Sequence, residues 1–212
     1  KQPEKIADPL ICHPDIRRML LTMKSLIEGN RMLVAWIAIN VDRMEQGETP
    51  EIKQEAEDLV QLMTPIIKAF MTDTGSEITN LAMQIYGGHG YIQETGVEQF
   101  VRDARIAQIY EGANGIQALD LIGRKLSANT GRYLRRFFHP VQEFVDQYSQ
   151  DESLKEFVEP LAKALGRLQQ VTMTIAQKSL VNPDEAGAAA TDYLRLFALV
   201  TLAYLWCQAV IV

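Results

Sequence analysis

The sequence predicts an all-α fold, an antiparallel up-down helical bundle with additional carboxy-terminal helices. Three observations lead to this prediction. Apolar residues recur at three- and four-residue steps over long segments, helix-starting and helix-ending residues separate these segments, and no convincing β-type alternation occurs. Short connections between long helices favour antiparallel packing. Hydrophobic residues make up 47% of the 212 positions, enough for a substantial core.

The first two predicted helices carry clear apolar stripes. Pro14 suits the first turn of a helix whose stripe comprises Leu20, Met23, Ile27, Val34 and Ile37. Thr49 is expected to cap the second helix and Pro50 to occupy its first position. The stripe of the second helix comprises Ala56, Leu59, Met63, Ile66 and Phe70. Pro65 should kink this helix or mark a local break, because proline removes a backbone donor.

Five further helical segments are expected, at about 95–107, 114–127, 132–148, 154–180 and 184–212. Asn182, Pro183 and Glu185 form a good helix start, with a cap, a proline at the first position and an acid three residues after the cap. The stretch 196–212 is nearly free of charge and almost long enough for a membrane span, which takes about 20 apolar residues. We interpret it as a buried core helix and predict no membrane span. Two domains are predicted, 1–128 and an extra helical region, 129–212, that we expect to be truncated.

Charge and cysteine content narrow the class of partner. The net charge is −6, which disfavours non-specific attraction to nucleic acid or to an anionic membrane surface. Cys12 and Cys207 lie far apart in the sequence and form no Cys-x-x-Cys pair, so a reducing, cytoplasmic location is expected. Residues 1–5 lack the features of a signal peptide and resemble the end of a linker.

One carboxylate and one glycine-rich turn are the candidate functional features. Glu111 lies in Tyr110-Glu111-Gly112, just ahead of a predicted helix, where an acid is more often a favourable charge at the helix end than a catalytic base. The turn 87–90 reads Gly-Gly-His-Gly, and by itself it is more often a tight break between helices than a phosphate-binding loop. From the residues alone, both alternatives stay open.

The residues around these features resemble the carboxy-terminal helical domain of the flavin-dependent acyl-CoA dehydrogenases. The resemblance is carried by 84–91 (Gln-Ile-Tyr-Gly-Gly-His-Gly-Tyr), 101–106 (Val-Arg-Asp-Ala-Arg-Ile), 109–112 (Ile-Tyr-Glu-Gly) and 116–126. It implies that 1–128 is the family's four-helix-bundle domain. The opening 11–20 looks like the 3-methylthiopropanoyl-CoA dehydrogenase-like branch, and 129–212 is similar to the extra helical region of that branch.

The resemblance implies α,β-dehydrogenation of an acyl-CoA thioester with FAD as cofactor. Glu111 matches the family's catalytic base, which takes the α-proton while hydride passes to flavin N5. Tyr110 and Gly112 are implied to contact the acyl-CoA substrate. The implied FAD-binding positions are Gln84, Gly87, Gly88, Gly112, Ala113 and Gly115. In the family, the run at Gln84 contacts the ADP half of an FAD held mainly by the neighbouring subunit.

The sequence departs from the family directly after the base. Many relatives read Tyr-Glu-Gly-Thr, whereas Ala113 here brings no hydroxyl, and Asn114 is expected to cap the following helix. The other domains that the family uses to bind flavin and acyl-CoA are expected outside this chain, so we expect the chain alone to be inactive. The alternative is a non-catalytic helical binding or oligomerisation module that has lost flavin chemistry, which Ala113 and Gly115 favour.

The remaining charged groups have structural interpretations. Arg102, Asp103 and Arg105 are expected to form a partly buried ion pair that steadies the glycine turn. The three arginines in 132–136 are expected to be a solvated face and not a nucleic-acid site. The three histidines are scattered, so no metal site is predicted. The implied partners are acyl-CoA, an electron-transfer acceptor protein and further copies of the chain, as a homodimer or homotetramer, with no nucleic acid.

Overall fold

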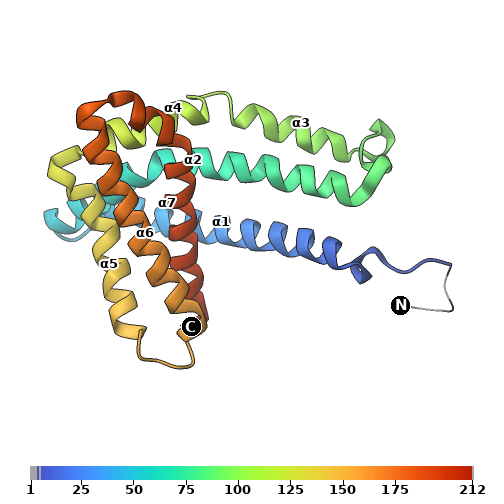
Figure 1. Cartoon of the computed structure of the whole chain (residues 1–212), viewed down its shortest axis with the longest axis horizontal. Helices are drawn as coiled ribbons and strands as arrows, with labels where there is room; N and C mark the ends of the chain where they lie inside the picture. Colours follow the sequence, from blue (N-terminus) through green and yellow to red (C-terminus); the bar gives the residue numbers. More distant parts are fainter. Residues whose placement is uncertain (1–3, 5, 212) are drawn as a thin grey trace.

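The computed structural model describes residue 4 and residues 6–211, and it confirms the all-α prediction. Helices α1 (Pro14–Gln46), α2 (Pro50–Tyr86) and α3 (Val97–Ala107) run side by side, with α2 packed between its two neighbours (Figure 1). Successive members of this layer run in opposite directions because short connections join them. The linker predicted at residues 1–5 lies, apart from residue 4, outside the described residues.

The second half of the chain lies across one end of this layer. A short helix α4 (Asn114–Asp120) leads into a π-helical turn (Leu121–Lys125), which ends the helix expected over 114–127 earlier than predicted. Helices α5 (Arg132–Tyr148), α6 (Lys155–Val181) and α7 (Pro183–Ile211) then stand across α1 and α2, so that the free ends of α1, α2 and α3 project beyond them (Figure 1).

Local start signals in the sequence act as expected. The hydroxyl of Thr49 accepts a hydrogen bond from the backbone N–H of Ile52 at 3.3 Å, which caps α2. The side-chain oxygen of Asn182 accepts from the backbone N–H of Asp184 at 3.1 Å, where α7 begins. Pro65 does not break α2, which is continuous from Pro50 to Tyr86. The neighbouring Ile66 is fully buried, and this packing holds the helix together across the missing donor.

The two predicted apolar stripes differ in outcome. Every predicted stripe residue of α2 is buried. The stripe predicted for α1 is wrong in part, since Leu20, Ile27 and Val34 are 37%, 45% and 46% exposed, while Met19 and Leu33 are buried. The physical reason is that α1 extends beyond α5–α7 and only α2 lines its length, so one face of α1 remains uncovered within the described chain (Figure 1).

One hydrophobic core joins both halves of the chain. It runs from Leu33 of α1 through α2, α4 and α5 to the apolar helix α7, and the rings of Phe137 and Phe197 meet within it at 4.7 Å between centroids. Helix α7 is long and apolar enough to pass a length-and-composition test for a membrane span, but half of its most apolar window is buried against other helices. Packing of this kind is that of a core helix. The boundary expected after Ala128 therefore crosses a shared core, and the two domains remain a prediction.

Candidate functional site

Glu111 lies on the short loop between α3 and α4, which we call the 108–113 loop (Figure 1). Its backbone is left-handed, with φ of +54°, and Gly112 follows with φ of +82°. A non-glycine residue in this region is strained and is found mainly where the surroundings impose it, often at functional sites. The Glu111 side chain is exposed to solvent. The loop therefore presents a carboxylate outward on a backbone that the rest of the chain must hold.

Side chains from α2 hold the 108–113 loop at both ends. Lys68 Nζ donates to the carbonyl oxygen of Gly112 at 2.7 Å and to the side-chain oxygen of Asn114 at 2.8 Å. Asp73 Oδ1 accepts from the side-chain amides of Gln108 and Asn114, each at 2.6 Å. We call Lys68, Asp73, Gln108 and Asn114 the loop clamp. Because bonds to charged groups are stronger than neutral ones, the clamp can hold the strained backbone of Glu111.

Asn114 does not cap α4, and that prediction is wrong. The cap position is Ala113, which offers no side-chain hydrogen bond, and Asn114 is the first helical residue. Its amide points back to α2 and donates to the carbonyl of Ala69 at 3.1 Å and to Thr72 at 2.9 Å. A side chain at the first position of a helix can reach an adjacent helix, and here that contact replaces a local cap.

Gln117 makes the last contact with the loop. Its side-chain nitrogen donates to the carbonyl of Glu111 at 3.2 Å. A Cβ added to Gly112 would lie 2.8 Å from this nitrogen, and the positive φ of Gly112 also disfavours a side chain. Both observations explain why glycine follows Glu111. The positions implied to contact FAD or substrate here, Tyr110, Gly112, Ala113 and Gly115, are all exposed around Glu111.

The glycine-rich turn forms a 3₁₀ segment, Gly87–Gly90, directly after α2. Gly87 has φ of +59°, and a Cβ placed on either Gly87 or Gly88 would meet no atom within 4 Å. Gln84 beside them is exposed. Gly90 is different, because a Cβ there would lie 2.6 Å from the carbonyl oxygen of Met83. The turn is thus closely packed at Gly90, whereas the backbone at Gly87 and Gly88 is accessible. A flat or phosphorylated group, such as the ADP half of FAD, could approach the backbone there. These residues fit the implied cofactor.

The structure divides the predicted site residues into two groups. Glu111 and its neighbours follow α3, whereas Gln84, Gly87 and Gly88 precede it at the free end of the layer (Figure 1). The length of α3 separates the groups within one copy. This arrangement agrees with two distinct contact regions for an extended ligand.

The ion pair predicted among Arg102, Asp103 and Arg105 is absent from the described structure, so that prediction is wrong. Arg102, Asp103 and Arg105 are exposed and form no ion pair in the part of the chain that the structure describes. Asp103 instead accepts from Gln99 at 2.7 Å, and Arg105 donates to Gln108 at 2.6 Å. The reason is the helical spacing, which brings residues three or four apart into contact.

The arginines of α5 are not simply a solvated face. Arg132 donates to both carboxylate oxygens of Asp58, at 2.7 and 2.8 Å, and Arg136 donates to Glu55 at 2.8 Å. The Asp58 side chain is 0% exposed, so the pair with Arg132 is a buried contact on its acidic side. This hydrogen bond to Asp58 raises the pKa of Arg132 above its ordinary value. We call Glu55, Asp58, Arg132 and Arg136 the Asp58 cluster.

Sequence reasoning missed Lys68, Thr72 and Asp73. A signal for them exists, because these polar residues interrupt α2 next to the buried Ile66, Ala69 and Phe70. Polar groups placed beside a buried stripe usually have a hydrogen-bonding partner. That signal does not identify the partner, which lies more than 35 residues away in the sequence for every contact of Lys68 with the loop.

No group of three or more His, Cys, Asp or Glu residues that could hold a metal ion occurs among the described residues. Cys12 and Cys207 are both free thiols. Burial raises the pKa of the Cys207 thiol. The described chain therefore offers its candidate chemistry through Glu111 and the open glycine turn.

Two family models match this chain. The model described as acyl-CoA dehydrogenase, C-terminal domain, matches residues 1–126, and the model described as acetyl-CoA dehydrogenase C-terminal like matches residues 137–212. The helical layer with its exposed Glu111 loop thus belongs to a class of carboxy-terminal helical domains found in acyl-CoA dehydrogenases. The chain belongs to the acyl-CoA dehydrogenase family.

Curated relatives agree with this assignment. The chain is 38% identical over 90% of its length to the 3-methylmercaptopropionyl-CoA dehydrogenase of Ruegeria pomeroyi, of which it covers 32%. It is 31% identical over 86% of its length to the broad-specificity linear acyl-CoA dehydrogenase FadE5 of Mycobacterium tuberculosis, of which it covers 31%. The chain therefore spans about a third of the length of these relatives.

Solved structures show the same fold at lower identity. The structure of Caenorhabditis elegans ACDH-11 in complex with C11-CoA matches with a TM-score of 0.75 and 22% identity, over 94% of this chain and 34% of that chain. The apo form of Bd2924 matches with a TM-score of 0.69 and 17% identity, over 97% of this chain and 36% of that chain. These likenesses concern the fold.

Proposed function

We propose that the chain is the carboxy-terminal part of an FAD-dependent acyl-CoA dehydrogenase that carries out α,β-dehydrogenation of an acyl-CoA thioester. One observation carries the proposal. Glu111 stands exposed on a left-handed backbone that four side chains of the loop clamp hold in place. An acid that only favoured a helix end would not require a strained and clamped loop.

In this proposal, Glu111 removes the α-proton of the acyl thioester. Removal of this proton needs a carboxylate held within hydrogen-bond reach of the carbon, and the loop clamp supplies the rigidity. Tyr110 and Gly112 contact the substrate beside the base. The chemistry that FAD would supply when bound is acceptance of the hydride from the β-carbon. Gln84, Gly87 and Gly88 would hold the ADP half of an FAD seated mainly on the neighbouring subunit, while Gly112, Ala113 and Gly115 would contact FAD beside Glu111.

The test is Glu111→Gln in the complete protein. The variant should retain bound flavin but lose the bleaching of the flavin absorbance by acyl-CoA, because the amide cannot take the α-proton. A fall of at least a thousand-fold in the bleaching rate is expected, on the order of the loss that follows removal of an essential base. Glu159→Gln, at an exposed position on α6, is the matched control and should bleach normally.

The competing function is a non-catalytic helical module without flavin chemistry. The missing hydroxyl at Ala113 is the observation that favours it. A complete protein that folds but holds no FAD, and shows no bleaching before any mutation, would support this alternative and reject the dehydrogenase. Normal bleaching by Glu111→Gln would reject Glu111 as the base while leaving the family assignment unaffected.

The proposal includes the setting of the enzyme. We expect a homodimer or homotetramer, because apolar side chains such as Phe100, Ile106 and Ile116 on α3 and α4 are 66%, 56% and 57% exposed. The electrons would leave through an electron-transfer acceptor protein. A cytoplasmic location is proposed from the acidic charge and the free thiols. The 212-residue chain by itself is expected to be inactive.

A further inference from the structure

A cavity of about 680 Å³ lies between the two layers of helices, away from the 108–113 loop. Its walls come from α1, α2, α5 and α7, and none of its lining residues belongs to the stretch between α2 residue Leu59 and Arg132. The volume is within the range of about 300–1,000 Å³ that small-molecule sites occupy. The cavity is thus separate from the proposed dehydrogenase site in both position and residues.

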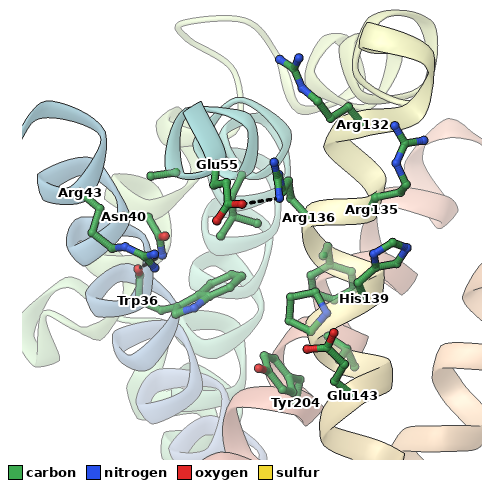
Figure 2. A pocket seen from close by; sticks show the side chains of 15 residues that line it. Trp36, Asn40, Arg43, Glu55, Arg132, Arg135, Arg136, His139, Glu143 and Tyr204 are labelled. Carbon is green, nitrogen blue, oxygen red and sulfur yellow. Dashed lines mark hydrogen bonds and ion pairs between the residues drawn. The ribbon is translucent and has the colours of Figure 1, made fainter. Parts of the chain in front are cut away.

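The lining of the cavity is positively charged in an acidic chain. Four arginines line it, against the carboxylates of Glu55 and Glu143. Figure 2 shows Arg43 on the α1 side and the arginines of α5 on the opposite side, with the ion pair of Glu55 and Arg136 lying between Arg43 and Arg135. The whole chain carries a net charge of −6, so this concentration of arginine is a local reversal of sign.

Two of these arginines have no acidic partner among the described residues. Arg132 and Arg136 are engaged by Asp58 and Glu55. Arg135 donates only to the backbone carbonyl of Thr130, at 2.9 Å, and the guanidinium of Arg43 forms no hydrogen bond or ion pair within residues 4 and 6–211. Guanidinium donors of this kind match phosphate and carboxylate oxygens.

The floor of the cavity is aromatic and apolar. Trp36 of α1 and Tyr204 of α7 project into it below the arginines (Figure 2), and the fully buried Phe137 closes it from α5. A flat or apolar body can lie against such a floor, and arginine above it adds attraction to an anionic end. The arginines and the aromatic floor together therefore favour a molecule that carries both an anionic group and a flat or apolar body.

We infer that this cavity binds a small organic anion with a phosphate or carboxylate group and a flat or apolar body. The anion meets the guanidinium group of Arg43 on the α1 side, Arg135 adds positive charge from the α5 side, and the body lies against Trp36 and Tyr204. The ligand would bridge helices from both layers, so its binding should raise the melting temperature as well as give a titration signal. This site does not depend on the dehydrogenase proposal.

The test uses phenyl phosphate, benzoate and phenol as probes on the complete protein as purified, with calorimetric titration and melting temperature as readouts. Phenyl phosphate and benzoate share a flat ring and differ in the anion, so they distinguish the two sources of negative charge. Phenol has the ring without the charge. Saturable binding of at least one anion, several-fold tighter than phenol and weakened by added salt, is expected.

Variants then locate the binding. Arg43→Gln with Arg135→Gln should weaken binding of the anion at least ten-fold, while the pairs of Asp58 and Glu55 stay intact. The matched control is Arg31→Gln with Arg167→Gln, which removes the same charge from exposed positions outside the cavity and should leave binding unchanged. The inference is overturned if neither anion binds, if phenol binds equally well, or if both double variants weaken binding alike.

Discussion

Helix α2 carries two polar clusters that differ in what their charged side chains hold in place. The Asp58 cluster buries a carboxylate completely and pairs it with arginines of α5 that keep about a third of their side-chain surface exposed. The loop clamp uses Lys68 and Asp73 to hold backbone and amide groups of an exposed loop. The first contact joins two helices, and the second fixes the conformation of a loop. On the same helix, the Asp58 cluster thus stabilises the packing of α2 against α5, whereas the loop clamp positions the loop that carries Glu111.

The largest expected effect on stability comes from Asp58→Ala. Removal of the buried carboxylate leaves Arg132 without its partner, and loss of one member of a buried ion pair costs several kcal/mol. The arginines are partly solvated, so we expect the free energy of unfolding to fall by about 3 kcal/mol, measured by urea unfolding. The rate of flavin bleaching per folded molecule should stay near the wild-type value.

Glu77→Ala is the matched control for that experiment. Glu77 pairs with Arg195 at 3.0 Å between side chains that are 38% and 47% exposed. Exposed pairs contribute about 0–1 kcal/mol, so this variant should unfold almost as the wild type does. Equal losses in the two variants would show that burial of Asp58 brings no special dependence on its partners.

Lys68→Met should affect flavin bleaching more than stability, the opposite of what we expect for Asp58→Ala. The methionine keeps much of the apolar stem but loses the bonds to Gly112 and Asn114, so the strained loop is released. We expect the free energy of unfolding to fall by only about 1 kcal/mol, and flavin bleaching in the complete protein to slow by about 10- to 100-fold, because small displacements of a reacting group are costly.

Lys163→Met is the control for Lys68→Met, since Lys163 is exposed on α6. Its bleaching rate and stability should match those of the wild type. A Lys68→Met protein with normal bleaching would remove the positioning role from the loop clamp and leave it as a structural contact like the Asp58 cluster.

The smallest effect concerns an uncharged buried pair, Thr172 and Tyr193, whose oxygens lie 2.7 Å apart between α6 and α7. Burial raises the pKa of Tyr193 well above its ordinary value of 10.0. A raised folded-state pKa means that this stabilisation is fully present below pH 10 and is lost as the pH rises above it. The free energy of unfolding should therefore decline above about pH 10.

Tyr193→Phe should flatten that alkaline decline, at a cost of about 1 kcal/mol or less at neutral pH. A residual slope should remain, because burial also raises the pKa of Tyr204. The control is Tyr91→Phe, at a side chain that is 77% exposed, and it should keep the wild-type pH profile. An unchanged decline in Tyr193→Phe would assign the alkaline loss to other groups.

The sequence predicted those features that depend on neighbours along the chain. Thr49 and Asn182 lie within three residues of the N–H groups that they cap, and the helical period identified the stripe of α2. The glycine after Glu111 was also recognisable, through its resemblance to a known motif. The role of Glu111 itself remains a prediction.

The sequence did not reveal contacts that the tertiary structure creates. Lys68 meets Gly112 across 44 positions, and Asp58 meets Arg132 across 74. Asp58 lies beside apolar residues in the sequence, and Arg132 lies in a basic run. Neither pattern indicates that the two side chains pair with each other, because only the packing of α2 against α5 brings them together. On α1, the helical period correctly predicted a helix, but it could not show that part of the apolar stripe is left uncovered by other helices.

The central position of α7 has a consequence for how the molecule loses its structure. This helix contacts α1, α2, α4 and α6, and its buried residues belong to the same core as those of α2. Helices that share one core cannot open independently without exposing each other's apolar surface. The regions matched by two family models should therefore melt in one cooperative transition, with the middle of α7 among the last segments to exchange its amide hydrogens.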